Sequence, residues 1–290
     1  MKSLLLTILF CIANIIGWSQ DEVKIFHITS SHTSFPDTGR SNGHLYNKVI
    51  YDALTHYNDS SVLIIVPRKF HFKKRPDLIF WFHGWGNHID SAATRYDLIN
   101  QFIKSNTAAI LVLAETAKDA PDSYGGKLER SGEFNLLVND ILNKLMTEKI
   151  IPKPTVAGKV VLAGHSGAYR VMAYILQNGN VPVNEVILFD ALYAETDKYL
   201  GWLKADDHHR FIDLYTDHGG TDGESKQMMN LLSNNNMRYN SLEETQLNQE
   251  VLQRNKILFI HSTHAHNDII QSPDNFELFI EGFKDSEGPE

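Results

Sequence analysis

A single serine lies where an apolar run passes into a helix-like segment. Ser166 follows Gly164 and precedes Gly167 in the sequence VVLAGHSGAYRVMA, residues 160–173. An apolar run that leads through glycines directly into a helix predicts a sharp strand-to-helix turn, which lifts the central side chain clear of the backbone. A serine held in this way serves as a nucleophile once a neighbouring base takes its proton. The segment therefore predicts covalent catalysis by Ser166.

Acidic and basic side chains follow other apolar runs of the chain. Asp190 ends one run, Asp217 ends the next, and His264 and His266 follow the last one, in HSTHAHND. A carboxylate that orients a histidine, and a histidine that deprotonates a serine, form a catalytic triad. The chain thus offers Ser, Asp and His in that order, with two candidates each for the acid and the base.

Short apolar runs alternate with amphipathic segments along the chain. Seven runs rich in Val, Ile, Leu and Phe predict strands at 61–67, 77–84, 108–115, 159–166, 185–192, 210–217 and 256–263. Helical spacing of apolar residues predicts helices at 91–105, 131–149, 168–179, 224–235 and 274–284. Short, nearly continuous apolar runs are typical of strands that are buried on both faces. We expect an α/β fold, a doubly wound and mostly parallel sheet with helices on both faces, which binds ligands beyond the carboxyl ends of its strands.

In its order of strands and motifs, the chain resembles the α/β-hydrolase superfamily. Within the superfamily it is similar to secreted bacterial serine esterases of an uncharacterised subfamily. The resemblance covers roughly residues 60–285, and the segment APDSYGGKLERSGEFNLLVNDIL is similar to bacterial hydrolases of this superfamily. The GHSGA elbow departs from Gly-x-Ser-x-Gly at Ala168, where a small residue still suits close helix packing. The link ALYAETDKYLGWLKADDHH is too short for a large lid, so one catalytic domain over 21–290 is expected.

The resemblance also implies roles for the candidate residues. The superfamily usually places its histidine in the loop after the last strand, at the start of a helix, which favours His266 over His264. Its acid usually follows the strand after the next helix. In this chain that strand is the run RFIDLYTD, which favours Asp217, while Asp190 matches a less common arrangement.

The segment FHGWGNH, residues 82–88, is the counterpart of the superfamily's oxyanion loop. The resemblance implies that the backbone N–H groups of Trp85 and Gly167 form the oxyanion hole, where two fixed donors stabilise the developing charge. His83 is expected to support this loop. Trp85, His165 and Tyr193 are the candidates for contact with substrate.

Composition excludes several classes of function. The net charge is −8, and it becomes −9 without Lys2, which argues against nucleic acid as a partner because phosphate binding needs a basic surface. The only cysteine is Cys11, so residues 21–290 contain no disulfide, thiol nucleophile or thiolate metal site. The histidines after the last run also permit a metal site, but without an evident further ligand we expect no metal and no cofactor.

Residues 1–20, MKSLLLTILFCIANIIGWSQ, predict a secretory signal peptide, with an uncleaved anchor as the alternative. No later apolar run is long enough for a stable membrane span. The chain is therefore expected to be secreted or periplasmic. The leading hypothesis is a serine hydrolase that acts on small-molecule or carbohydrate-borne carboxylic esters. An amidase or peptidase, and a non-catalytic binding protein on the same scaffold, remain alternatives.

Overall fold

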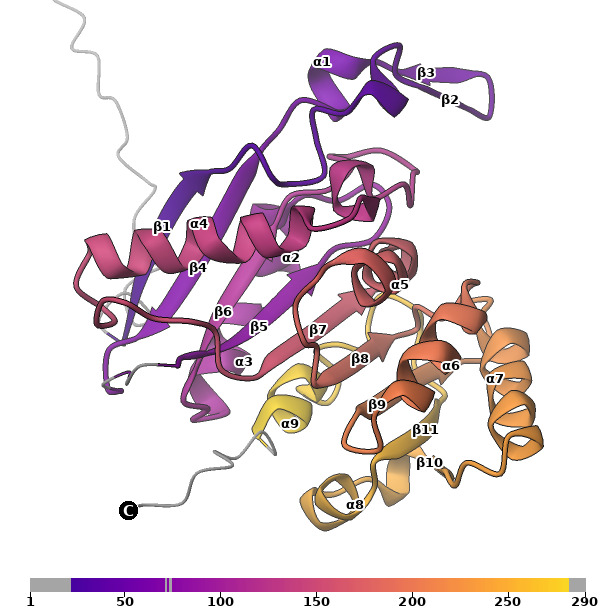
Figure 1. Ribbon diagram of the computed structural model, residues 1–290. Coiled ribbons are helices and arrows are strands. Elements are labelled where there is room, and N and C mark those ends of the chain that lie inside the picture. Colours follow the sequence, from indigo (N-terminus) through magenta and orange to yellow (C-terminus); the bar gives the residue numbers. More distant parts are fainter. Residues whose placement is uncertain (1–21, 71, 73–74, 282–290) are drawn as a thin grey trace, which may run out of the picture.

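A mostly parallel sheet runs through the centre of the molecule (Figure 1). The computed structural model describes residues 22–70, 72 and 75–281, and within these residues the sheet has nine strands. Their spatial order is β1 (Val23–Thr29), β4 (Ser61–Pro67), β6 (Ala109–Ala114), β5 (Asp77–Phe82), β7 (Val160–His165), β8 (Glu185–Phe189), β9 (Arg210–Thr216), β11 (Ile257–Ser262) and β10 (Asn240–Glu243). β4 runs antiparallel to both of its neighbours, and every pair from β6 to β10 is parallel.

Helices cover both faces of this sheet. One face packs against α4 (Glu133–Thr147), α5 (Tyr169–Asn178), α6 (Thr196–Ala205) and α7 (Asp222–Asn234). The other face packs against α2 (Ile89–Arg95), α3 (Leu98–Lys104), α8 (Gln249–Arg254) and α9 (Asn275–Glu281). The predicted doubly wound α/β class is therefore confirmed.

The apolar runs form strands because both of their faces are buried. Along β7, Val161 packs into the cluster on the α2 side, whereas Leu162 packs into the cluster on the α4 side. Successive side chains of a strand point to opposite faces, so a strand covered by helices on both sides needs apolar residues at nearly every position. This is why the runs show no polar alternation.

The helix predicted over residues 91–105 is divided into α2 and α3. Asp97 interrupts it with a left-handed backbone, at φ 50°. Its carboxylate accepts a hydrogen bond from the Asn100 side chain at 2.6 Å, and the Gln101 amide donates to the Tyr96 carbonyl at 2.7 Å. These local contacts stabilise a break that apolar spacing does not reveal.

The carboxyl ends of the parallel strands meet at one edge of the sheet. A separate hairpin, β2 (His44–Tyr46) and β3 (Val49–Tyr51), is followed by the short helix α1 (Ala53–His56) and projects beyond this edge (Figure 1). The connection from β8 to β9 contains only α6, so the expected absence of a large lid holds for the described residues. The predicted signal peptide lies outside the described residues. Within them, none of the helices combines the length and apolar character needed to span a bilayer.

Candidate active site

Ser166 lies at the sharp turn between β7 and α5. Its φ is 55°, a left-handed value that is strained for a residue with a side chain. A Cβ atom on Gly164 would lie 2.6 Å from the Met172 sulfur and 2.7 Å from the Ala168 Cβ. The helix after the serine therefore packs directly on the strand before it, and Ala168 is small enough for this approach. The turn leaves the Ser166 side chain partly exposed at the N-terminal end of α5.

His266 contacts Asp190, which directly follows β8. The His266 Nδ1 lies 2.6 Å from the Asp190 Oδ2, and the Asp190 side chain is fully buried. Because an ionised carboxylate only accepts hydrogen bonds, His266 donates its Nδ1–H. The Nε2 of the ring is then left as an acceptor. This is the tautomer that a general base for a serine requires.

Asp190 is held by two threonines that the sequence analysis did not single out. Its Oδ1 accepts from the Thr216 backbone N–H at 3.1 Å and from the Thr221 hydroxyl, and its Oδ2 accepts from the Thr216 hydroxyl at 2.7 Å. Burial alone would raise the pKa of Asp190, but the hydrogen bonds from His266, Thr221 and Thr216 outweigh burial and lower it. Asp190 is therefore an ionised carboxylate inside the protein.

Asp217, the expected acid, is not brought to His266. It is half exposed, and its Oδ1 lies 2.9 Å from the Nε2 of His261, which also contacts Glu243. Successive side chains along an extended chain point to opposite sides. Since Thr216 points toward Asp190, Asp217 points away from it. The alternate acid Asp190 takes the position at the histidine.

His264, the alternate base, lies apart from the other candidates. Its Nε2 is 3.8 Å from the Glu244 Oε2, and its side chain is 42% exposed. The histidine within β11, His261, and the two that follow it, His264 and His266, therefore face different carboxylates, and they do not converge on a common point.

Within the part of the chain described, the residues close enough to share a cation are Asp206, Asp207 and His208. All three are exposed, and they precede β9, so they lie at the opposite edge of the sheet from Ser166. This group has no relation to the candidate active site.

The loop after β5 passes directly beside Ser166. A Cβ atom on Gly84 would lie 2.6 Å from the Ser166 Cβ and 3.2 Å from its Oγ. A Cβ atom on Gly167 would lie 2.4 Å from the Trp85 Cδ1, so the indole covers Gly167. In the described chain, the backbone N–H groups of Trp85 and Gly167 donate no hydrogen bond to another group. Both donors are free for an oxyanion.

A buried ion pair supports this loop. The His83 Nε2 lies 2.6 Å from the Glu115 Oε1, its Nδ1 donates to the Gly84 carbonyl at 2.8 Å, and Glu115 also accepts from the Ile89 N–H. Burial lowers the pKa of His83, but the charge of Glu115 outweighs burial and raises it. An imidazolium can donate from both nitrogens. His83 therefore holds the start of the loop at the Gly84 carbonyl, and Glu115, its other partner, holds the end of the loop at the Ile89 N–H.

His165 lies beneath the surface and holds the loop that carries His266. It is buried, its Nε2–H donates to the His266 carbonyl at 2.9 Å, and its Nδ1 accepts from the Tyr96 hydroxyl at 3.2 Å. Burial, followed by the charge of His266, lowers the pKa of His165 to about 3, so the ring is neutral. Both nitrogens are engaged, and the expected contact of His165 with substrate does not fit this geometry. Tyr96 is a further residue that the sequence analysis missed.

Ser166 lies near His266 because the residue before it, His165, packs against the His266 ring. The described residues contain no hydrogen bond between the two side chains, but the rings of His165 and His266 lie 4.5 Å apart. Tyr193 completes this group, because its ring packs edge-on at 6.4 Å from that of His266 and its hydroxyl donates to the Gly219 carbonyl at 2.5 Å. Burial raises the pKa of Tyr193 to about 12, and the charge of Asp190 adds to this effect.

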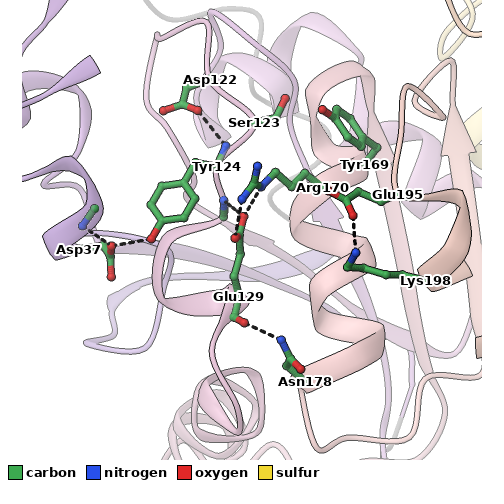
Figure 2. A network of polar contacts seen from close by, with 12 residues as sticks. Asp37, Asp122, Ser123, Tyr124, Glu129, Tyr169, Arg170, Asn178, Glu195 and Lys198 are labelled. Atoms are coloured by element: carbon green, nitrogen blue, oxygen red, sulfur yellow. Dashed lines mark hydrogen bonds and ion pairs between the residues drawn. The ribbon is translucent and has the colours of Figure 1, made fainter. Parts of the chain in front are cut away.

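Hydrogen bonds connect the loop before α4 to α5, the helix that follows Ser166 (Figure 2). Arg170 of α5 donates two hydrogen bonds to the Glu129 carboxylate, at 2.6 and 2.9 Å, and the Gly125 N–H donates to the same group. Ser123 on this loop accepts from the Trp85 indole N–H at 2.7 Å. The network therefore holds the indole in place over Gly167.

Comparison with solved structures identifies the architecture. A Clostridium thermocellum feruloyl esterase module complexed with sinapinate matches with a TM-score of 0.56 and 10% identity, covering 93% of this chain and 91% of that chain. A ferulic acid esterase matches with a TM-score of 0.55 and 11% identity, covering 90% of this chain and 99% of that chain. The substrate-bound fluorophosphonate-binding serine hydrolase F of Staphylococcus aureus matches at 0.54 and 11%, covering 90% and 99%.

No protein-family model matches the chain, and no curated protein is similar to it in sequence. At these identities, the structural matches establish the fold. The chain has the α/β-hydrolase fold.

Proposed function

We propose that this protein is an exported serine hydrolase that cleaves carboxylic esters through an acyl-enzyme. The observation that carries the proposal is the 2.6 Å contact between His266 and the buried Asp190, beside a serine on a strained strand-to-helix turn. The fold shared with esterases supports it. Export rests on the sequence of residues 1–20.

The residues of the site divide the proposed reaction among them. The Nε2 of His266 takes the proton of Ser166 as the serine oxygen attacks the ester carbonyl. The backbone N–H groups of Trp85 and Gly167 bind the resulting oxyanion. His266 then protonates the leaving alcohol, and water releases the acid by the same steps in reverse. Asp190 stabilises the imidazolium throughout.

Small soluble esters and acyl groups borne by carbohydrates are the substrates we put first. The site has no large lid, and Trp85 is 46% exposed beside the oxyanion donors. Tyr193 lies next to His266. Flat rings with polar edges suit both sugar and acyl groups.

A fluorophosphonate tests the proposal directly, because it reacts with an activated serine. The purified chain should gain one adduct by intact mass, and Ser166→Ala should gain none. Ser41→Ala is the matched control, since Ser41 is an exposed serine whose hydroxyl donates to the Thr38 carbonyl, away from Trp85 and Gly167. It should be labelled like the parent. A folded parent without an adduct would overturn the proposal.

A further inference from the structure

The phenol of Tyr193 has a fixed position inside the candidate active site. Its hydroxyl donates to the Gly219 carbonyl at 2.5 Å, and its ring lies 5.9 Å from the Tyr169 ring and 6.4 Å from the His266 ring. A Cβ atom on Gly220 would lie 3.3 Å from the Tyr193 Cε1, so the backbone after Gly219 also approaches this ring. A hydrogen bond and packing around the ring therefore hold the phenol oxygen in place.

The hydrogen bond to Gly219 determines the chemistry of the phenol. A tyrosine hydroxyl has a single proton, and a backbone carbonyl can only accept it. Burial raises the pKa of Tyr193 to about 12, so the phenol keeps this proton at neutral pH. The lone pairs of the oxygen remain available. While it keeps its bond to Gly219, Tyr193 is therefore a hydrogen-bond acceptor toward the site and contributes no donor to an oxyanion.

This acceptor lies beside both the serine and the histidine of the site. The Tyr193 ring contacts His266, and it also contacts Tyr169, the first residue of α5. Burial raises the pKa of Tyr193 and the charge of Asp190 adds to this effect, whereas hydrogen bonding with the Ser166 side chain lowers it. Because the proton of the phenol is directed to a carbonyl, Ser166 is the donor in that contact.

The second half of the proposed reaction removes this donor. In the acyl-enzyme, the Ser166 Oγ carries the acyl group in place of its proton, so the acceptor at Tyr193 has lost its partner. The attacking water has two protons, and it gives one of them to the Nε2 of His266. A water whose two protons are held by two fixed acceptors cannot rotate, and correct orientation of a reactant lowers its barrier.

We propose that Tyr193 is a positioning residue that orients the hydrolytic water, an inference that rests on the proposed function. In the acyl-enzyme, the water donates one hydrogen bond to the His266 Nε2 and one to the Tyr193 oxygen. The water oxygen bonds to the acyl carbon as His266 takes the first proton. The bond from that carbon to the Ser166 Oγ then breaks, and His266 returns the proton to the serine. The second proton leaves with the carboxylic acid, and Tyr193 keeps its own.

Competition between water and methanol tests this role, with 4-nitrophenyl acetate as the acyl donor. Methanol has a single hydroxyl proton, which His266 takes, so none is left for Tyr193. In Tyr193→Phe, hydrolysis should slow by about threefold to tenfold, the effect of losing one neutral hydrogen bond, while methanolysis keeps its rate. The ratio of methyl acetate to acetate at a fixed methanol concentration should rise by the same factor. Phenylalanine keeps the ring contacts with His266 and Tyr169, so the variant retains the shape of the site.

The product ratio separates this role from a structural one. If the hydroxyl only held the loop at Gly219, its loss would slow both reactions equally, because His266 serves both; an unchanged ratio therefore overturns the proposal. Tyr239→Phe is the matched control and should keep the ratio of the parent. The Tyr239 hydroxyl lies 3.5 Å from the Ser233 Oγ, before β10, at the opposite edge of the sheet from the candidate active site.

Failure of the proposed function gives a different result. A parent that forms neither acetate nor methyl acetate, and that fluorophosphonate does not label, refutes the proposed hydrolase and the role of Tyr193 with it. A labelled parent that forms both products, beside an active Tyr193→Phe with the same product ratio, refutes the role of Tyr193 alone.

Discussion

The contact between Asp190 and His266 makes the sharpest prediction, through the substitution Asp190→Asn. The Asp190 Oδ1 accepts the backbone N–H of Thr216, which can only donate. The oxygen of the new amide must therefore take that position, and its NH₂ group must replace Oδ2 and face the His266 Nδ1. That nitrogen then becomes an acceptor, so the proton moves to Nε2. His266 can no longer accept the proton of Ser166.

The expected loss follows from this tautomer. In a triad, the wrong tautomer with intact geometry costs about four orders of magnitude in kcat, which corresponds to about 5.4 kcal/mol of barrier. The free energy of unfolding should fall by less than this. Two charge-assisted hydrogen bonds to Oδ2, from His266 and the Thr216 hydroxyl, are weakened or lost, for a total of about 1–3 kcal/mol.

The assay is kcat on a soluble aryl acetate, with near-ultraviolet circular dichroism as the measure of folding. Asp217→Asn is the matched control and should keep kcat within about twofold, because an exposed ion pair contributes about 0–1 kcal/mol. If folded Asp190→Asn kept more than about a tenth of kcat, or Asp217→Asn lost as much activity, the assignment of the acid would be refuted.

Three further experiments, with four substitutions, test neighbouring parts of the site and the core. His266→Ala should abolish turnover of the aryl acetate while His264→Ala leaves it nearly unchanged, and the reverse result would move the base to the exposed histidine. Gly84→Ala should lower kcat on the same ester without unfolding the chain, because its Cβ would lie 2.6 Å from the Ser166 Cβ, and unchanged kcat would show that the loop can shift. Asp213 is buried, and only its Oδ2 has a hydrogen-bond partner among the described residues. Burial raises the pKa of Asp213 to about 7 in the folded chain, above the value of about 3.9 for an aspartate in an unfolded chain. The unfolded chain therefore gives up this proton first as pH rises, so the parent should lose stability between about pH 4 and 7 relative to Asp213→Asn; parallel melting temperatures across that range would contradict this.

The fold could be predicted because burial on both faces leaves a mark in the sequence. Strands such as β7 are apolar at nearly every position, and the glycines around Ser166 indicate the turn that follows. These signals are local, so no knowledge of distant contacts is needed to interpret them.

The acid could not be chosen from the sequence because Asp190 and Asp217 both follow buried strands. What separates them is the direction of Thr216, whose hydroxyl and N–H bind Asp190 and thereby turn Asp217 outward. The direction of the His165 side chain was equally hidden in the sequence. Its position next to Ser166 suggested contact with substrate, yet its ring is buried and holds the His266 carbonyl. Side-chain direction at a strand end depends on neighbouring strands, which the sequence does not specify.

The separation of Asp190 and His266 by 76 residues has a consequence for biosynthesis. Translation supplies Ser166 and Asp190 first, and His266 comes only after β11, the last strand of the described residues, which pairs between β9 and β10. A nascent chain or fragment that ends before β11 contains neither His266 nor His264, and under the proposed mechanism it would not react with fluorophosphonate. Reactivity with fluorophosphonate would therefore mark the moment at which the sheet is completed, and it could time maturation in a pulse-chase experiment.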